Sequence, residues 1–250
     1  AHLSRGDSVS ARPDTGALLD ARGLEAFYGR AQILFGVSLS VARGEVVALL
    51  GRNGAGKSTT LKTLMGLVPP RAGTITFGGQ RVDGRAPYAI CRLGLGYVPE
   101  DRRVFAELSV EENLEVGRRP KRDDAPHWTP ARLYELFPNL GRMRDRRGGE
   151  MSGGEQQMLT IARTLMGNPL AVLLDEPSEG LAPVIVEQMG AAIRELKREG
   201  LALLISEQNL RFAETITDRA LILEKGAIRF EGTMAALMAD DAARRAYLSV

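Results

Sequence analysis

The stretch GRNGAGKS, residues 51–58, decides the fold of this chain. It matches the phosphate-binding loop pattern, in which glycines let the backbone curl so that successive N–H groups face a phosphate. In this pattern Lys57 reaches the β- and γ-phosphates of a nucleotide, and the hydroxyl of Ser58 ligates Mg²⁺. The residues expected to contact the nucleotide here are Gly51, Asn53, Gly54, Ala55, Gly56, Lys57, Ser58 and Thr59.

The segments on either side supply the strand and the helix that this loop requires. EVVALL, residues 45–50, is a continuous apolar run, which is typical of a strand buried on both faces. A helix is expected over residues 57–68, with one apolar face, and Pro69 and Pro70 are expected to stop it. Because this helix begins at the loop, its positive end points at the bound anion.

Apolar strand patterns alternate with helical ones further along the chain. AVLLDEP at 171–177 is interpreted as a buried strand, LALLISEQ at 201–208 as a further strand, and residues 183–199 as a helix that Gly200 follows, which favours a parallel α/β sheet. Before the loop, residues 17–29 and 33–45 alternate apolar and polar side chains and indicate antiparallel strands. Residues 87–150 instead hold short helical stretches separated by proline, glycine and charge.

These patterns predict one domain over residues 17–250, preceded by a disordered lead-in over residues 1–16. The expected fold class is α/β. A P-loop NTPase core, with a mostly parallel sheet flanked by helices, carries an antiparallel β subdomain. An α-helical subdomain is inserted at about residues 87–165.

The composition excludes several classes of protein. Of 250 residues, 44% are hydrophobic and 26% are charged, which is ordinary for a globular domain. With a net charge of only +2, no strong electrostatic footprint points to nucleic acid. A single cysteine, Cys91, excludes an internal disulfide, and no apolar run approaches the ~18 residues that span a bilayer.

A nucleotide site also needs a carboxylate for the metal and a group that activates water. AVLLDEP, residues 171–177, offers both. Asp175 ends the expected buried strand, where it can hold Mg²⁺ or a water of the metal. Glu176 follows it at the mouth of the same sheet, and we expect it to act on water near the γ-phosphate.

A second glycine-rich stretch, MSGGEQQM at residues 151–158, stands where a helix should begin. Ser152 and Glu155 fit a capping box, which accounts for the ends of SGGE but not for its middle. Each glycine costs about 1 kcal/mol in a helix relative to alanine. The pair makes sense if an anion must approach the backbone at this helix start. That anion belongs either to another ligand or to the same nucleotide, approached from a second chain.

The phosphate loop, MSGGEQQM, LLDEP and the helical insertion, in this order, resemble the ATP-binding subunit of ABC transporters over residues 17–235. The resemblance implies that two subunits pair head to tail, so that Ser152, Gly153 and Gly154 of one close on the γ-phosphate of ATP bound by the other. Tyr28 resembles the aromatic residue that stacks on adenine in this family. A tyrosine of the core or of a strand edge is the alternative.

Three positions depart from the family pattern. GYVPE, residues 96–100, resembles the switch loop that usually ends in glutamine but here ends in Glu100, which can ligate Mg²⁺ through water. Gln208 stands where the family carries its switch histidine, and Ala182 where a loop aspartate is common. Gln208 can hydrogen-bond the γ-phosphate but cannot shuttle a proton. The hypothesis is that Glu176 accepts the proton and Gln208 positions the phosphate and water.

YVPEDRRVF, LSVEENL, DEPSEGLAP and EQN together resemble the ATPases of branched-chain (hydrophobic) amino acid importers, in particular the shorter of the two unlike ATPases that such importers use. The ATPases of urea and short-chain amide importers are very similar, so both substrate classes stay open. A soluble ABC ATPase outside transport is a further alternative. The single phosphate loop and the absence of sustained heptads favour a transporter subunit.

The resemblance also implies partners and a location. The partners are a second cassette ATPase, two integral-membrane permease subunits and, indirectly, a periplasmic or extracellular solute-binding protein; no nucleic acid is expected. The chain is expected as a peripheral protein on the cytoplasmic face of the inner (plasma) membrane. Its membrane contact is expected on the helical insertion, near residues 100–115.

Overall fold

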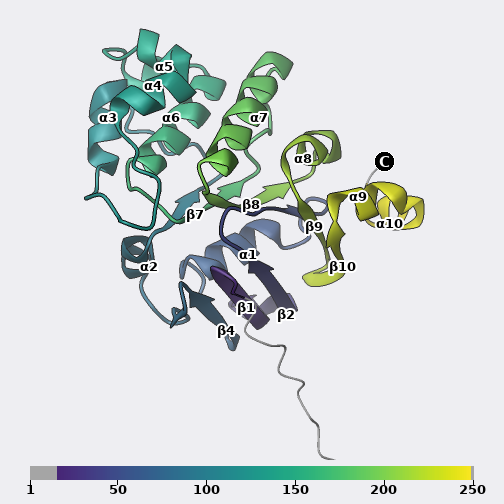
Figure 1. Ribbon diagram of the computed structural model, residues 1–250. Helices are drawn as coiled ribbons and strands as arrows, with labels where there is room; N and C mark the ends of the chain where they lie inside the picture. The colour runs from purple at the N-terminus through teal and green to yellow at the C-terminus, as the bar shows by residue number, and fades with distance from the viewer. Residues whose placement is uncertain (1–15, 249–250) are drawn as a thin grey trace, which may run out of the picture.

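The computed structural model describes residues 16–248. Apart from Gly16, the expected lead-in over residues 1–16 lies outside the described residues. Within residues 16–248 the chain forms a six-stranded sheet, a four-stranded antiparallel sheet, and helices packed between and around them (Figure 1). The predicted α/β class with a P-loop core, an antiparallel β subdomain and a helical subdomain is confirmed.

The six-stranded sheet carries the phosphate-binding loop. Its order is β10-β9-β3-β8-β7-β6, and its pairs are parallel except β9 with β10. All residues of β3, β7 and β8 are buried, which agrees with their largely apolar sequences, and the polar residues at the ends of β7 and β8 are buried with them. The strands are β3 (Val46–Leu50), β6 (Leu95–Val98), β7 (Ala171–Asp175), β8 (Ala202–Glu207), β9 (Arg219–Glu224) and β10 (Ala227–Thr233).

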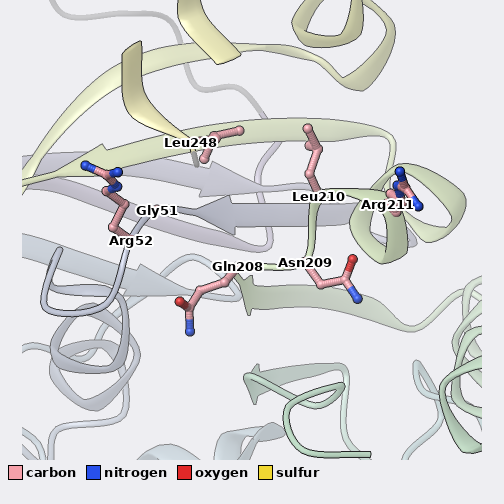
Figure 2. Close-up of a pocket in the computed structure, with 7 residues that line it drawn as sticks. All are labelled: Gly51, Arg52, Gln208, Asn209, Leu210, Arg211 and Leu248. Carbon is pink, nitrogen blue, oxygen red and sulfur yellow. The ribbon is translucent and has the colours of Figure 1, made fainter. Parts of the chain in front are cut away.

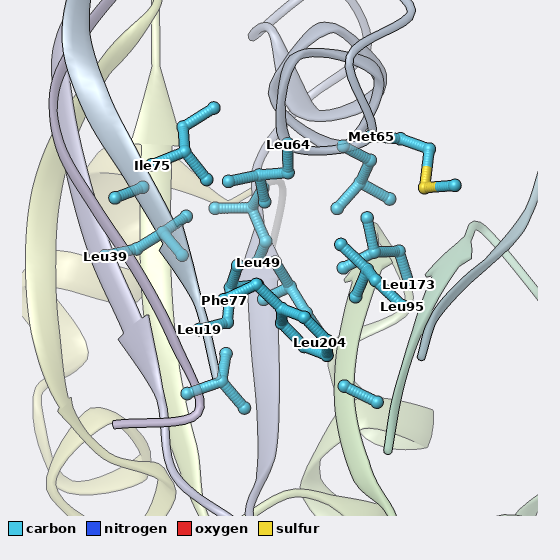
Figure 3. Close-up of a cluster of buried hydrophobic side chains, with 14 of the residues drawn as sticks. Leu19, Leu39, Leu49, Leu64, Met65, Ile75, Phe77, Leu95, Leu173 and Leu204 are labelled. Atoms are coloured by element: carbon cyan, nitrogen blue, oxygen red, sulfur yellow. The ribbon is translucent and has the colours of Figure 1, made fainter. Parts of the chain in front are cut away.

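The four-stranded sheet, of order β2-β1-β4-β5, is antiparallel. Its strands are β1 (Leu19–Tyr28), β2 (Ala31–Val41), β4 (Ala72–Phe77) and β5 (Gln80–Arg81). Helix α1 (Lys57–Leu64) lies between this sheet and the larger one (Figure 1). One buried apolar cluster joins all three layers, and Figure 3 shows Leu64 and Met65 among side chains of both sheets. This packing fixes α1, and with it the loop that precedes it.

Helix α1 is shorter than the sequence predicted. It ends at Leu64 rather than near residue 68, because Gly66 adopts a φ of 74°. A Cβ at Gly66 would lie 2.6 Å from the carbonyl oxygen of Arg85, so the chain turns away against another segment before it reaches Pro69. Glycine at the end of a helix commonly takes this left-handed conformation.

The helical insertion packs around a second apolar cluster, which it shares with α7 (Pro183–Arg198). It comprises α3 (Val110–Gly117), α4 (Pro130–Leu136), α5 (Pro138–Arg142), the 3₁₀ turn η1 (Gly148–Glu150) and α6 (Gly153–Leu165). The predicted range of 87–165 also includes α2 (Pro87–Leu93) and β6. Because β6 pairs with β7 in the larger sheet, the helices that leave the sheet begin only after Val98.

The remaining helices lie along the second half of the chain. They are α8 (Leu210–Ile216), α9 (Met234–Ala239) and α10 (Asp241–Tyr247), of which the last two were not predicted. Helix α7 begins at a proline and is followed by Gly200 with a φ of 83°, as expected. Over residues 16–248, none of the helices combines the length and apolar character that a membrane crossing needs.

Candidate active site

The phosphate-binding loop is held from behind by strands. A Cβ at Gly51 would lie 2.3 Å from the carbonyl oxygen of Leu223 in β9, and one at Gly56 would lie 3.1 Å from the side chain of Leu34 in β2. Gly54, with a φ of 76°, differs in its surroundings, because a Cβ there would meet no atom within 4 Å. Gly51 and Gly56 therefore allow the loop to pack closely on the strands, and Gly54 allows a backbone turn where the loop has no such neighbour.

Lys57 lies almost wholly buried at the start of α1. Its Nζ donates to the carbonyl oxygens of Gly51, at 2.8 Å, and Arg52, at 3.2 Å. The same Nζ is 3.0 Å from Oε1 of Glu176, and both side chains of this ion pair are buried. The loop lysine and the carboxylate predicted to activate water are thus brought into direct contact.

Asp175 ends β7 and has hydrogen-bond donors at both carboxylate oxygens. Its Oδ1 accepts from Ser58 Oγ at 3.0 Å and from Ser206 Oγ at 2.6 Å. Its Oδ2 accepts from the hydroxyl of Tyr97 in β6 at 3.2 Å. Burial, followed by the Asp175 charge, raises the pKa of Tyr97, so this phenol stays a proton donor. The two residues predicted to hold the metal, Ser58 and Asp175, are therefore in direct contact.

Glu176 occupies a strained backbone position, with a φ of 47°. Its N–H donates to the backbone oxygen of Ser206 at 3.1 Å and to its Oγ at 3.0 Å, which holds the turn. On the side chain, Oε2 accepts from Nε2 of Gln208 at 2.6 Å. Burial acts to raise the pKa of Glu176. Hydrogen bonds from Glu179, Gln208 and Lys57 outweigh burial and lower that pKa below its ordinary value.

The other predicted residues lie around this centre. Tyr28 ends β1 and is 48% exposed. Glu100 is exposed just after β6. Ser152 caps α6 through the predicted capping box, in which its Oγ accepts from Glu155 N and the Glu155 carboxylate accepts from Ser152 N. Gly153 and Gly154 form the first turn of α6.

Comparison with known proteins identifies the family. The family model described as ABC transporter matches residues 34–179. The branched-chain amino acid transport ATP-binding protein BraG of Pseudomonas aeruginosa is 45% identical over 90% of this chain and 97% of its own length. The lipopolysaccharide export system ATP-binding protein LptB of Escherichia coli K12 is 36% identical, over 93% and 97%.

The chain belongs to the ABC transporter family. Two solved structures agree with this assignment. A nucleotide-free ATP-binding cassette from an ABC transporter superposes with a TM-score of 0.77 at 26% identity, over 90% of this chain and 96% of that one. An ATP-binding subunit of an ABC transporter gives 0.76 at 32% identity, over 92% of each chain. The chain is therefore a nucleotide-binding ATPase subunit.

Glu207 lies beside the predicted site of this ABC ATPase, and the sequence analysis did not predict it as a site residue. It is 2% exposed at the end of β8. Its carboxylate accepts from the backbone N–H groups of Ser178 at 3.1 Å, Gln208 at 3.2 Å and Asn209 at 3.3 Å. Burial raises its pKa above the ordinary value. One buried carboxylate thus joins the loop after Glu176 to the loop that carries Gln208.

A cavity of about 260 Å³ adjoins the phosphate-binding loop of this ABC cassette (Figure 2). Its lining includes two residues predicted for the site, Gly51 and Gln208, and a loop residue beside them, Arg52. Figure 2 shows Gln208 and Asn209 extending from the chain that follows β8. The cavity therefore lies between the start of the phosphate-binding loop and residues 208–211, which follow β8. It is also lined by Leu210, Arg211 and Leu248.

Glu179 faces three other carboxylates in this ABC ATPase. The hydrogen bond that it shares with Glu176, followed by partial burial and the charges of Glu176, Glu100 and Glu207, raises the pKa of Glu179 to about 7. Glu176 and Glu179 therefore hold one proton between them below pH 7, with the negative charge on Glu176.

Substitution of Glu179 by glutamine should change how stability depends on pH. The folded chain holds the Glu179 proton more tightly than the unfolded chain, whose glutamate has a pKa of 4.5. This contribution to stability is present at low pH and is lost as the pH rises towards 7. The free energy of unfolding, measured in urea, should therefore be higher in Glu179→Gln than in wild type, and this difference should be larger at pH 8 than at pH 5. Glu187→Gln, on the exposed face of α7, is the control, and an equal difference at both pH values contradicts the assignment.

Proposed function

We propose that this ATPase powers the import of branched-chain amino acids as a peripheral subunit on the cytoplasmic face of the membrane. The observation that carries the proposal is the 45% identity to BraG across 97% of the length of that relative. Two integral-membrane permeases and a second cassette ATPase complete the assembly, with a solute-binding protein outside the membrane. ATP is the nucleotide.

The donor set at the end of β7 fits Mg²⁺. Ser58 Oγ lies 3.0 Å from a buried aspartate oxygen, and both are the hard oxygen ligands that Mg²⁺ takes. No group of three or more His, Cys, Asp or Glu side chains gathers as a metal site among residues 16–248. This supports a metal that takes its other ligands from phosphate and water. Ser58 and Asp175 would hold the metal, with Glu100 reaching it through water, and Mg²⁺ there would neutralise charge on the phosphates.

For hydrolysis, Glu176 takes the proton of the attacking water, and Gln208 orients that water and the γ-phosphate. Lys57 supports this division, because its Nζ lies within reach of both the loop carbonyls and Glu176. When Lys57 turns to phosphate oxygens, Glu176 Oε1 is released to accept from water. The amide of Gln208 donates to Glu176 at 2.6 Å and keeps the carboxylate oriented. A lowered pKa keeps Glu176 ionised, as a base requires.

Head-to-tail pairing supplies the rest of the site. Tyr28 stacks on the adenine of ATP bound in its own chain, and its exposed ring supports this role. Ser152, Gly153 and Gly154 close on the γ-phosphate held by the partner subunit. The helix start at Gly153 directs backbone N–H groups and the positive end of the helix dipole at that anion.

Uptake measurements test the proposed substrate. In cells that carry the tagged chain, the assembly is purified from membranes and uptake of labelled leucine and labelled urea is measured in parallel. We expect two permeases and a second ATPase to co-purify, and leucine uptake to fail in a Lys57→Ala strain. Uptake of urea and not of leucine would change the proposed substrate to urea and would leave the transport function in place. A tagged chain that co-purifies with no permease contradicts the transport function.

Charge reversal at Glu111 should uncouple transport from ATP hydrolysis. Glu111 is exposed in the first turn of α3, in the region expected to contact the permeases. We expect Glu111→Lys to lose most leucine uptake while the basal ATPase activity stays unchanged. Its neighbour Glu112 is unsuitable, since its carboxylate completes the capping box of α3. Glu135→Lys, at an exposed position of α4, is the control, and unaltered uptake in Glu111→Lys counts against this contact surface.

A further inference from the structure

Arg102 links two parts of the proposed trans site within one chain. It lies on the loop that follows β6, with a φ of 45°. Its Nη2 donates to the carbonyl oxygen of Glu179 at 3.0 Å. A side chain from the switch-loop region is therefore anchored on the loop that follows Glu176.

The guanidinium also fills the space that Gly153 leaves. A Cβ at Gly153 would lie 2.2 Å from Arg102 Nη1, and one at Gly180 would lie 3.6 Å from Nη2. Alanine at residue 153 would push the guanidinium aside, a shift that the end of a flexible arginine side chain makes at little cost. The absence of a side chain at residue 153 keeps a cation against the first turn of α6.

This arrangement places like charges together. The N-terminus of α6 carries the positive end of the helix dipole, and the Arg102 guanidinium lies against it. An arginine is favoured at the opposite end of a helix. An anion that binds both groups relieves this repulsion and gains charge-assisted hydrogen bonds.

Carboxylates outnumber ammonium groups around Glu176. Asp175, Glu176 and Glu179 gather there, and Lys57 is the cation paired with Glu176. Gln208, where a histidine stands in related ATPases, brings no charge. The γ-phosphate adds further negative charge to this group of carboxylates. A positive group brought by the partner subunit would offset it.

We propose that Arg102 acts in trans, as a second cation on the γ-phosphate held by the partner subunit, beside Ser152, Gly153 and Gly154. This inference rests on the proposed head-to-tail pairing. Its chemistry is bidentate donation from the guanidinium to phosphate oxygens. The hydrogen bond to Glu179 holds the guanidinium in position, so the same contact signals to the loop beside Glu176 when the two subunits close.

The test uses the assembly purified from membranes through a tag on this chain, with kcat and KM for MgATP as readouts. Arg102→Gln keeps a donor for the Glu179 carbonyl but removes the charge, whereas Arg102→Lys keeps the charge. We expect kcat to fall about 10- to 100-fold in Arg102→Gln, the range of one or two decades that a lost charged hydrogen bond gives. Both bound nucleotides hold the same dimer closed, so a defect at one of the two nucleotide sites should lower the kcat of the whole assembly. Arg102→Lys should recover most of the loss.

Binding of a fluorescent ATP analogue to the isolated chain separates trans from cis action. Affinity should be unchanged in Arg102→Gln, because Arg102 acts on nucleotide held by another chain. Arg103→Gln is the matched control, since Arg103 is the exposed neighbour whose side chain pairs with Asp101, and it should behave as wild type in both assays.

Other outcomes overturn the inference. A wild-type kcat in Arg102→Gln removes the role of the charge, and a raised kcat makes Arg102 an obstacle to closure. Weakened ATP binding by the isolated Arg102→Gln chain indicates action in cis. A tagged chain that brings down no second ATPase contradicts the proposed function and this inference with it. An active complex that is insensitive to Arg102→Gln contradicts the inference alone.

Discussion

Glu176→Gln should lower ATP turnover by about 10²- to 10⁴-fold, the contribution typical of a general base, while ATP binding persists. Glutamine has nearly the same shape but cannot accept the proton of water. Gln208, the group bonded to Glu176, cannot accept it either. Steady-state phosphate release and ATP binding, measured side by side, give the two quantities.

The control for this prediction is Glu179→Gln. Glu179 is the neighbouring carboxyl with a pKa of about 7, and it is the other group near the site able to exchange a proton at neutral pH. We expect it to retain most of the turnover, because Glu176 remains. Turnover that survives in Glu176→Gln but fails in Glu179→Gln would assign the base to Glu179.

Lys57→Ala should weaken ATP binding by about 100-fold or more. Two charge-assisted hydrogen bonds to phosphate, at roughly 1.5–3 kcal/mol each, account for this effect. The substitution should also destabilise the fold, since removal of one partner from a buried ion pair leaves the other charge uncompensated. The lowered pKa of Glu176 depends in part on Lys57, so this carboxyl should take up a proton more readily in the variant.

Equilibrium binding of ATP and urea unfolding measure the two consequences separately. Lys62→Ala is the matched control, because Lys62 lies in the last turn of the same helix and is less buried. It should leave both ATP binding and stability close to wild type. Equal ATP affinity in Lys57→Ala and Lys62→Ala would contradict the phosphate role of Lys57.

Local patterns predicted the frame of the site well. The loop at 51–58, the strand before it and the capping box at Ser152 depend on residues close in sequence, so a short stretch carries the information. The end of α1 was wrong because Gly66 turns the chain against Arg85, a contact between distant segments. Helices α9 and α10 are short, and their caps at Thr233 and Asp240 are weak signals on their own.

The surroundings of the carboxylates were not predictable in the same way. Ser206 meets Asp175 because the two are register partners on adjacent parallel strands. Tyr97 reaches the same aspartate from β6, on the other side of β7. An apolar sequence predicts that a strand is buried, but it does not predict which residues of the neighbouring strands lie beside it. Ser206 and Glu207 interrupt the apolar run at the end of β8, and this polar pair was the available signal.

The turn between β9 and β10 extends the site to a part of the chain far from the phosphate motif. Gly226 N donates to the carbonyl oxygen of Ala55 inside the loop, and Phe35 N donates to the carbonyl oxygen of Gly226. A Cβ at Gly226 would lie 1.8 Å from the carbonyl oxygen of Ile33. Chimeric cassettes assembled from two relatives therefore have to inherit residues 223–226 together with residues 33–35 and 51–56. A crossover between these segments would combine a phosphate-binding loop from one relative with the packing surface of another, and the contacts of Gly226 would no longer match.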